Sequence, residues 1–227
     1  MRILALDTST GAASVALGGD GEILALLALR IPRPSRSLLP VIEALLRALG
    51  LRPAELDAYA VACGPGSFTG LRVGMAAAQA MAFAHGRPAV GIGTLDAMAW
   101  AGRAHPAPLC PLVDARRGRV YAATYALEGA RPVRTGPEVD ADPRELLRSL
   151  THPVTLFGDG VRAHREAVAE AAPPGSRIVE CDEPLARAVL ELGAAALREG
   201  SAPAPGALRP RYVRPPDARL PGGGARG

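Results

Sequence analysis

Apolar and polar positions along this chain follow two patterns that together predict a mixed α/β fold. Short apolar or alternating runs bounded by Gly, Pro and Asp are typical of strands, and longer runs with a capping residue and a closing Gly are typical of helices. The expected strands are 2–7, 12–18, 22–30, 57–63, 89–92, 109–114, 120–127 and 154–157, and the expected helices are 35–49, 69–85, 94–101, 143–150, 162–171 and 185–198. Three consecutive strands open the chain, which favours a mixed sheet with an antiparallel edge over a doubly wound sheet.

A Pro-rich stretch at His105–Pro108 separates two regions of loosely similar element order, as a duplicated fold would show. We expect an N-terminal subdomain at 1–103 and a C-terminal subdomain at 104–205. A basic, Pro/Gly-rich tail follows at 206–227, and its first part is expected to pack back on the body.

Two helices of the first half lack the charged face that a surface helix normally presents to water. From Val73 to Ala84 there is no charge and one polar side chain, Gln79, and many of the residues are small. In the first helix the apolar positions exceed one stripe. Such helices are covered on nearly all sides, either within their own domain or by another chain, and in the second case they leave an apolar surface patch.

Two segments have the composition of phosphate-binding turns. Asp7–Gly11 follows the first strand, and Gly64–Gly70 is a glycine-rich turn before a helix, where exposed amides favour anions. The candidate side chains and amides are those of Asp7, Thr8, Ser9, Gly66, Ser67 and Thr69. The alternative is that the first segment satisfies a hairpin and that the glycines permit tight packing, with Phe68 inserted into the core.

Several catalytic classes are excluded by residue type and spacing, and no catalytic residue is assigned. The chain has no Lys, which rules out Schiff bases and Walker lysines, and Ser67 lacks the G-x-S-x-G context of a nucleophile elbow. The four histidines show neither H-x-x-x-H nor HExxH spacing, so we expect no metal site and no cofactor. Asp114–Tyr121 is expected to form a charged hairpin in which Asp114 pairs with Arg116 or binds a ligand.

Charge and cysteine content add little beyond this. The formal net charge is +4, and the tail after Gly206 accounts for it with five Arg and one Asp, so the tail either meets RNA phosphates or is simply a Pro/Gly-rich end. Three widely spaced cysteines do not suggest a disulfide framework, and no signal peptide or membrane span is recognised. We therefore expect a cytoplasmic protein.

Seven segments, in order along nearly the whole chain to Arg214, resemble the bacterial TsaB (YeaZ) family of tRNA threonylcarbamoyladenosine biosynthesis proteins. The most specific is GPGSFTGLRVG at Gly64–Gly74. The others are ILALDTST at Ile3–Thr10, SRSLLPVIEALL at Ser35–Leu46, GIGTLDAMA at Gly91–Ala99, DARRGRVYAATY at Asp114–Tyr125, FGDG at Phe157–Gly160 and PRYVR at Pro210–Arg214. Pro34 stands where family members often have His.

The resemblance implies an actin-like (ASKHA, ribonuclease H-like) α/β fold of two related subdomains with mixed sheets. It also implies a non-catalytic subunit that stabilises the catalytic paralogue TsaD by heterodimerisation, with the ATPase TsaE as a further partner, a homodimer when alone, and tRNA reached through the complex. The expected interface residues are Leu38, Leu39, Ile42, Leu46, Arg72, Val73, Ala76, Ala77, Ala80 and Met81. Two alternatives stay open, a stand-alone actin-like nucleotide-binding enzyme and a peptidase.

Overall fold

The computed structural model describes residues 1–19, 21–29, 34–180, 183–200 and 205–213. The first half follows the predicted order of strands and helices. Its elements are β1 (Ile3–Asp7), β2 (Ala13–Gly19), β3 (Glu22–Leu29), α1 (Pro34–Ala48), η1 (Pro53–Glu55), β4 (Ala58–Gly64), α2 (Phe68–His85), β5 (Ala89–Gly93), α3 (Thr94–Ala101) and η2 (Gly102–Ala104). α1 begins at Pro34, the residue that stands where family members often have His.

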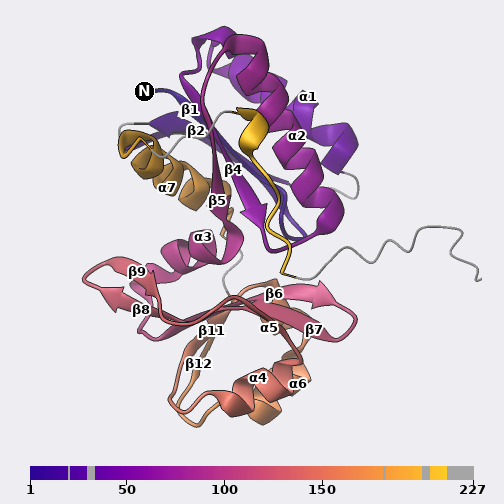
Figure 1. Cartoon of the computed structure of the whole chain (residues 1–227), viewed down its shortest axis with the longest axis vertical. Helices are drawn as coiled ribbons and strands as arrows, with labels where there is room; N and C mark the ends of the chain where they lie inside the picture. Colours follow the sequence, from indigo (N-terminus) through magenta and orange to yellow (C-terminus); the bar gives the residue numbers. More distant parts are fainter. Residues whose placement is uncertain (20, 30–33, 181–182, 201–204, 214–227) are drawn as a thin grey trace, which may run out of the picture.

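The first sheet has the order β3-β2-β1-β4-β5 and is covered on both faces (Figure 1). β1, β2 and β3 are antiparallel neighbours, whereas β4 and β5 run parallel to β1. Along β1 the side chains alternate: Leu4 and Leu6 face α1 and α2, and Ile3 and Ala5 face the opposite side. Strands buried on both faces read as unbroken apolar runs, which is why the first strand has no polar residue before Asp7.

The second half forms its own sheet with helices on both faces. Its elements are β6 (Leu109–Arg116), β7 (Arg119–Ala122), β8 (Tyr125–Glu128), β9 (Arg131–Arg134), β10 (Val139–Ala141), α4 (Pro143–Ser149), β11 (Thr155–Phe157), α5 (Asp159–Ala163), α6 (Arg165–Ala171), β12 (Arg177–Val179), α7 (Ala186–Arg198) and η3 (Pro205–Ala207). α4 and α6 pack on one face of this sheet, and α3 packs on the other.

The two sheets share one topology, which confirms the duplicated fold. The second has the path β10-β7-β6-β11-β12, with β8 and β9 attached beside β6. In both sheets the first strand, β1 or β6, has antiparallel strands on one side and two parallel strands on the other. α3 lies between the two sheets, since Leu95 belongs to the core of the second and Ala97 to that of the first.

In the second half two element predictions are wrong and three short strands were missed. The strand expected at 120–127 is two strands, β7 and β8, that pair with different neighbours. The helix expected at 162–171 is interrupted at His164, whose φ of −122° and ψ of 35° are not helical. The short strands β9, β10 and β12 were not expected, because runs of three or four residues held by distant partners carry little local signal.

The expected boundary of the second subdomain is also wrong at its end. α7 falls within 104–205, yet it packs against β1, β2, β4 and β5 of the first sheet (Figure 1). The contact is close because small residues meet there: a Cβ on Gly193 would lie 2.6 Å from the Cβ of Ala60. In the segment that follows α7, Leu208 lies in the core of the first subdomain, and the arginine tail after Val213 lies outside the described residues.

A cluster of charged residues joins the two subdomains. Arg134 Nη2 donates to both carboxylate oxygens of Asp96 at 3.1 and 3.2 Å. Glu138, a largely buried residue of the second subdomain, pairs with Arg134 at 3.1 Å and with Arg211 of the C-terminal segment at 3.2 Å. Such a partly buried network fixes geometry more than it adds stability. Cys63 and Cys110 are buried free thiols, and Cys181 lies outside the described residues.

Candidate partner-binding surface

The exposed face of α2 is apolar along most of its length. The helix begins behind Ser67, whose hydroxyl accepts the amide of Gly70, and ends at Gly86 with φ of 61°. Between Arg72 and the last residue of the helix, His85, the solvent-exposed positions 76, 80, 83 and 84 are three alanines and Phe83, which is 84% exposed. The intervening residues pack inward on the core. We call positions 72, 76, 80 and 83 the α2 stripe.

α1 packs beside α2 and extends this face. Leu39 is 58% exposed, and a groove of about 730 Å³ opens between the two helices and η1. It is lined by Leu39, Pro40, Ile42, Glu43, Leu46, Arg47, Gly50, Leu51, Arg52, Pro53 and Met81. Of the expected interface residues, Leu39, Ile42, Leu46 and Met81 line this groove.

Their exposure divides the expected interface residues into three groups. Leu39, Arg72, Ala76 and Ala80 are exposed. Val73, Ala77 and Met81 are partly buried, and Leu38, Ile42 and Leu46 are at most 3% exposed. Leu38 was expected at the interface, but it is buried in the core between α1 and the sheet. Ile42 and Leu46 are also buried, yet they line the groove. Pairing through these helices stays a prediction.

Two aromatic residues on this side differ from expectation. Phe68 was expected to insert into the core, but it is 38% exposed and lies beside Tyr212, with ring centroids 5.4 Å apart. Phe83 was not among the expected interface residues. Its signal was present in the sequence, because the spacing 76, 80, 83 continues one helical stripe.

The two candidate phosphate turns meet and satisfy each other's polar groups. Ser9 donates to Asp7 Oδ1 from its amide at 2.9 Å and from its hydroxyl at 2.5 Å. The Thr8 hydroxyl donates to the carbonyl of Gly70 at 2.7 Å, and the amide of Ser67 donates to the carbonyl of Ser9 at 2.7 Å. Asp7, Thr8 and Ser9 are each 1% exposed. These donors are therefore directed at protein acceptors.

Glycines make this close approach between the turns possible. A Cβ at Gly66 would lie 2.3 Å from the carbonyl oxygen of Ser9, and one at Gly70 would lie 1.9 Å from that of Thr8. One turn further along α2, a Cβ at Gly74 would lie 2.3 Å from the Thr8 hydroxyl. The glycine-rich segment thus serves the packing of α2 on the Asp7–Ser9 turn, which is the structural alternative that the sequence left open.

Asp7 carries a burial cost that varies with pH. Burial raises its pKa from 3.8 to about 6, against hydrogen bonds from Ser9 that lower it. The Asp7 carboxyl binds its proton more tightly in the folded chain than in the unfolded chain. The buried charge therefore lowers the free energy of unfolding fully above about pH 6 and not at all below about pH 4.

We expect Asp7→Asn to remove this cost while keeping an acceptor oxygen for Ser9. The free energy of unfolding should rise by about 1–2 kcal/mol near neutral pH and stay unchanged near pH 4. Urea unfolding of both proteins across this pH range measures the difference. Parallel stability curves would show that the Asp7 charge does not burden the fold.

A cleft of about 350 Å³ lies where the two halves of the chain meet, lined by Thr10 and Gly11 from the first half and by Asp159 and Arg162 from the second, among others. Burial raises the pKa of Asp159, whose carboxylate accepts the amide of Asp114 at 3.0 Å. None of the six residues expected to bind phosphate lines this cleft.

The β6–β7 hairpin has the expected pairing of Asp114 with Arg116. The amide of Arg116 donates to Asp114 Oδ1 at 2.9 Å, and its guanidinium forms an ion pair with Oδ2 at 3.2 Å. His164 Nε2 lies 3.3 Å from Oδ1 of the same carboxylate. Asp114 is therefore occupied by its own neighbours.

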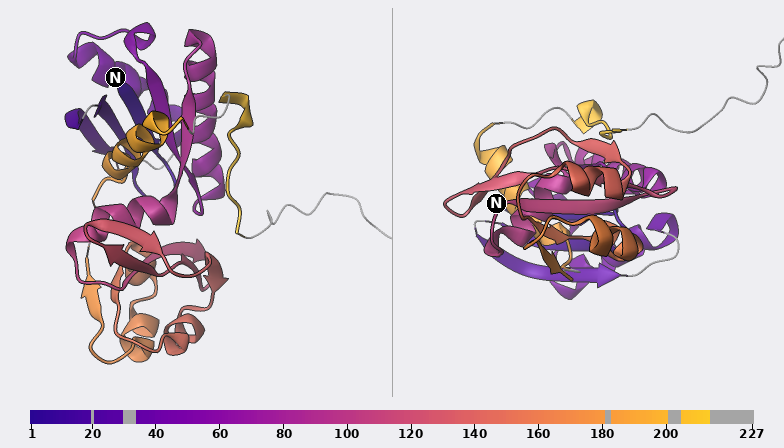
Figure 2. Two further views of the ribbon diagram at one scale, coloured as in Figure 1. Left: turned by 60° about the vertical axis from the view of Figure 1, so that its left-hand side comes forward. Right: turned by 90° about the horizontal axis from the view of Figure 1, so that it is seen from below.

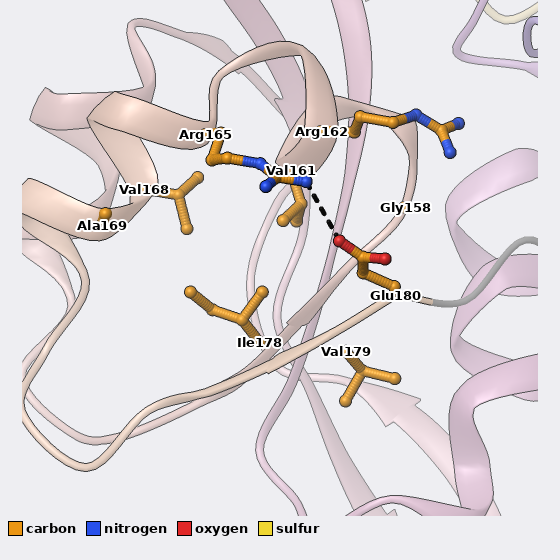
Figure 3. Close-up of a pocket in the computed structure, with 9 residues that line it drawn as sticks. All are labelled: Gly158, Val161, Arg162, Arg165, Val168, Ala169, Ile178, Val179 and Glu180. Carbon is orange, nitrogen blue, oxygen red and sulfur yellow. Dashed lines mark hydrogen bonds and ion pairs between the residues drawn. The ribbon is translucent and has the colours of Figure 1, made fainter.

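A further cavity, of about 230 Å³, lies between α5, α6 and β12 (Figure 3). Val161, Val168 and Ile178 form apolar walls, and Arg165 and Glu180 pair across it at 3.1 Å. The cavity is lined by none of the residues that the sequence analysis assigned to phosphate binding or to the interface.

Within the described residues, no three His, Cys, Asp or Glu side chains are placed to hold a metal ion. Among the same residues, we find no helix with the length and apolar character to cross a membrane.

Two sheets that share a five-stranded path, with a helix between them, define an actin-like α/β protein of two related subdomains, the ASKHA fold. Component A of (R)-2-hydroxyglutaryl-CoA dehydratase from Acidaminococcus fermentans is similar in fold alone, with a TM-score of 0.52 at 12% identity over 88% of this chain and 99% of that one. YeaZ from Pseudomonas aeruginosa is far more similar, with a TM-score of 0.80 and 30% identity over 93% of this chain and 99% of that one.

This chain belongs to the TsaB (YeaZ) family. A family model described as TsaD, tRNA N6-adenosine threonylcarbamoyltransferase, matches residues 33–216. The tRNA threonylcarbamoyladenosine biosynthesis protein TsaB of Bacillus subtilis is 30% identical over 172 residues, which are 74% of this chain and 75% of that protein. TsaB of Escherichia coli is 41% identical over 127 residues, and this alignment spans about half of each chain, 55%.

Proposed function

We propose that this chain is a non-catalytic subunit required to form N6-threonylcarbamoyladenosine next to the anticodon of tRNA. It stabilises the catalytic paralogue TsaD by pairing through α1 and α2. The observation that carries this proposal is the α2 stripe, where Ala76, Ala80 and Phe83 face solvent without a charge between them. An apolar face of this kind is typical of a surface covered by a partner.

The shape of the face suits a helical partner. Small side chains at Ala76 and Ala80 let another backbone approach closely, and the groove beside Leu39 offers room for larger side chains. The same face pairs two copies of this chain when TsaD is absent. The ATPase TsaE joins as a further partner, and tRNA is reached through the complex.

The contacts of the Asp7–Ser9 turn favour this role over a stand-alone nucleotide-binding enzyme. An enzyme of that kind needs donors and a carboxylate that face the ligand, whereas Thr8 and Ser9 donate to protein oxygens and Asp7 is buried with a raised pKa. A peptidase needs a nucleophile with a base, and Ser67 uses its hydroxyl to cap α2.

Reconstituted modification of tRNA tests the proposal. With TsaD, TsaE and the threonylcarbamoyl-adenylate donor present, we expect omission of this chain to lower the modified adenosine at least about tenfold, measured by mass spectrometry of tRNA nucleosides. Asp7→Asn should restore the yield to within about twofold of the wild type, because a subunit without catalysis does not need that carboxylate. Full modification without this chain would contradict the proposed role, and loss of activity in Asp7→Asn would favour the enzyme.

A further inference from the structure

The C-terminal segment Pro205–Val213 runs as a strap along α2 (Figure 2). Leu208 inserts into the first core, and its carbonyl accepts Gln79 Nε2 at 3.2 Å. One residue before the aromatic Tyr212, the strap is fixed to the sheet, because the amide of Arg211 donates to the carbonyl of Cys63 at 2.7 Å. The strap therefore has a defined position beside the helix that forms the candidate surface.

The guanidinium of Arg72 stacks on the Phe68 ring and donates a hydrogen bond to Tyr212. The Arg72 Cζ lies 3.9 Å from the centroid of the Phe68 ring, and its Nε donates to the Tyr212 hydroxyl at 3.2 Å. The rings of Phe68 and Tyr212 are themselves in contact, and each is more than one third exposed. Stacking and one hydrogen bond thus fix the plane of the guanidinium before any partner arrives.

Arg72 has no carboxylate partner within the part of the chain that the structure describes. Its contacts there are with the two aromatic residues, and Nε is the nitrogen used. The two terminal nitrogens form the donor fork that binds a carboxylate bidentately. Arg72 is also the first residue of the α2 stripe, one turn before Ala76.

We propose that the strap presents Arg72 as a pre-oriented fork for a carboxylate side chain of the polypeptide that covers α2, with Tyr212 as its positioning residue. This inference rests on the proposed pairing and names one of its specific contacts. A protein carboxylate fits better than an RNA phosphate. Phosphate contacts come from several basic residues together. α2 has one Arg beside alanines and Phe83, and of the two arginines on the described strap, Arg211 already pairs with Asp96 and Glu138. Fixing the side chain in advance removes much of the entropy cost of forming the contact.

Calorimetry on full-length proteins tests the proposed contact. It measures the dissociation constant of the complex between this chain and TsaD from the same organism. We expect Arg72→Gln to weaken pairing about tenfold or more and to flatten its dependence on salt concentration. Arg72→Lys should lose most of the same affinity, since an ammonium cannot form the fork. The matched control is Arg177→Gln, an exposed arginine of β12 in the other subdomain, which should change the constant less than about twofold.

A double-mutant cycle separates positioning from general support of the fold. Tyr212→Ala should weaken pairing about threefold to tenfold, and Tyr212→Ala with Arg72→Gln should be no weaker than Arg72→Gln alone. Additive losses, or wild-type affinity in Arg72→Gln, would overturn the inference and leave the proposed function standing. A wild-type chain that fails to pair with TsaD would overturn both. If Arg72→Gln, measured without TsaD, weakened tRNA binding as much as it weakens pairing, the group bound by Arg72 would be an RNA phosphate instead.

Discussion

Ala76→Arg is expected to weaken association with TsaD, and of the chain with itself, by at least about 100-fold. The substitution places a charged side chain in the middle of the α2 stripe, where pairing would remove it from water without a counter-ion. A 100-fold change corresponds to about 2.7 kcal/mol. Light scattering and calorimetry measure the two associations.

Ala76 is the better probe than the neighbouring Ala77, because Ala77 packs partly against the core and a charge there would also disturb the fold. Ala76 is exposed, so the free energy of unfolding of the monomer should change by less than about 0.5 kcal/mol. Ala163→Arg, an exposed alanine on α5, is the matched control and should pair like the wild type. Unchanged pairing in Ala76→Arg would place the association on another surface.

Gly70→Ala is expected to destabilise the chain by about 3 kcal/mol or more, because its Cβ would meet the carbonyl oxygen of Thr8 at 1.9 Å. The position of the Cβ is fixed by the backbone of α2 and the oxygen belongs to the backbone of Thr8, so relief requires a shift of α2 away from the Asp7–Ser9 turn. For a chain of this size that cost corresponds to a fall in Tm of roughly 6–12 °C, which calorimetry detects.

Gly11→Ala is the control for this prediction. A Cβ at Gly11 would meet nothing within 4 Å, so stability should stay within about 0.5 kcal/mol of the wild type. Equal Tm values for Gly70→Ala and the wild type would show that α2 can move off the turn without cost. The glycine-rich segment would then need another explanation than packing.

Local signals in the sequence were sufficient for the elements of the first subdomain and for the family. The uncharged stretch from Val73 to Ala84 also identified α2 as unusual. What the pattern could not decide was which residues of α1 face the core. Leu38 and Leu39 are neighbours of equal hydrophobicity, yet one is buried and the other exposed, because the sheet fixes the rotation of the helix.

Contacts between distant parts of the chain account for the remaining errors. The strand β12 has three residues and exists through its pairing with β11. Phe68 looked like a core residue because the sequence does not reveal that Tyr212, 144 positions away, lies beside it. The placement of α7 on the first sheet has the same cause, since an amphipathic helix does not encode which sheet it covers.

The position of α7 has a consequence for synthesis of the protein on the ribosome. One face of the first sheet, including Ala5, Ala60 and Val90, is covered by a helix that is translated about a hundred residues after β5. Until residues 186–198 emerge, the nascent chain exposes that face, which makes it a substrate for a holding chaperone. A fragment that stops near residue 103 would keep this face uncovered, so we expect it to aggregate when it is produced alone.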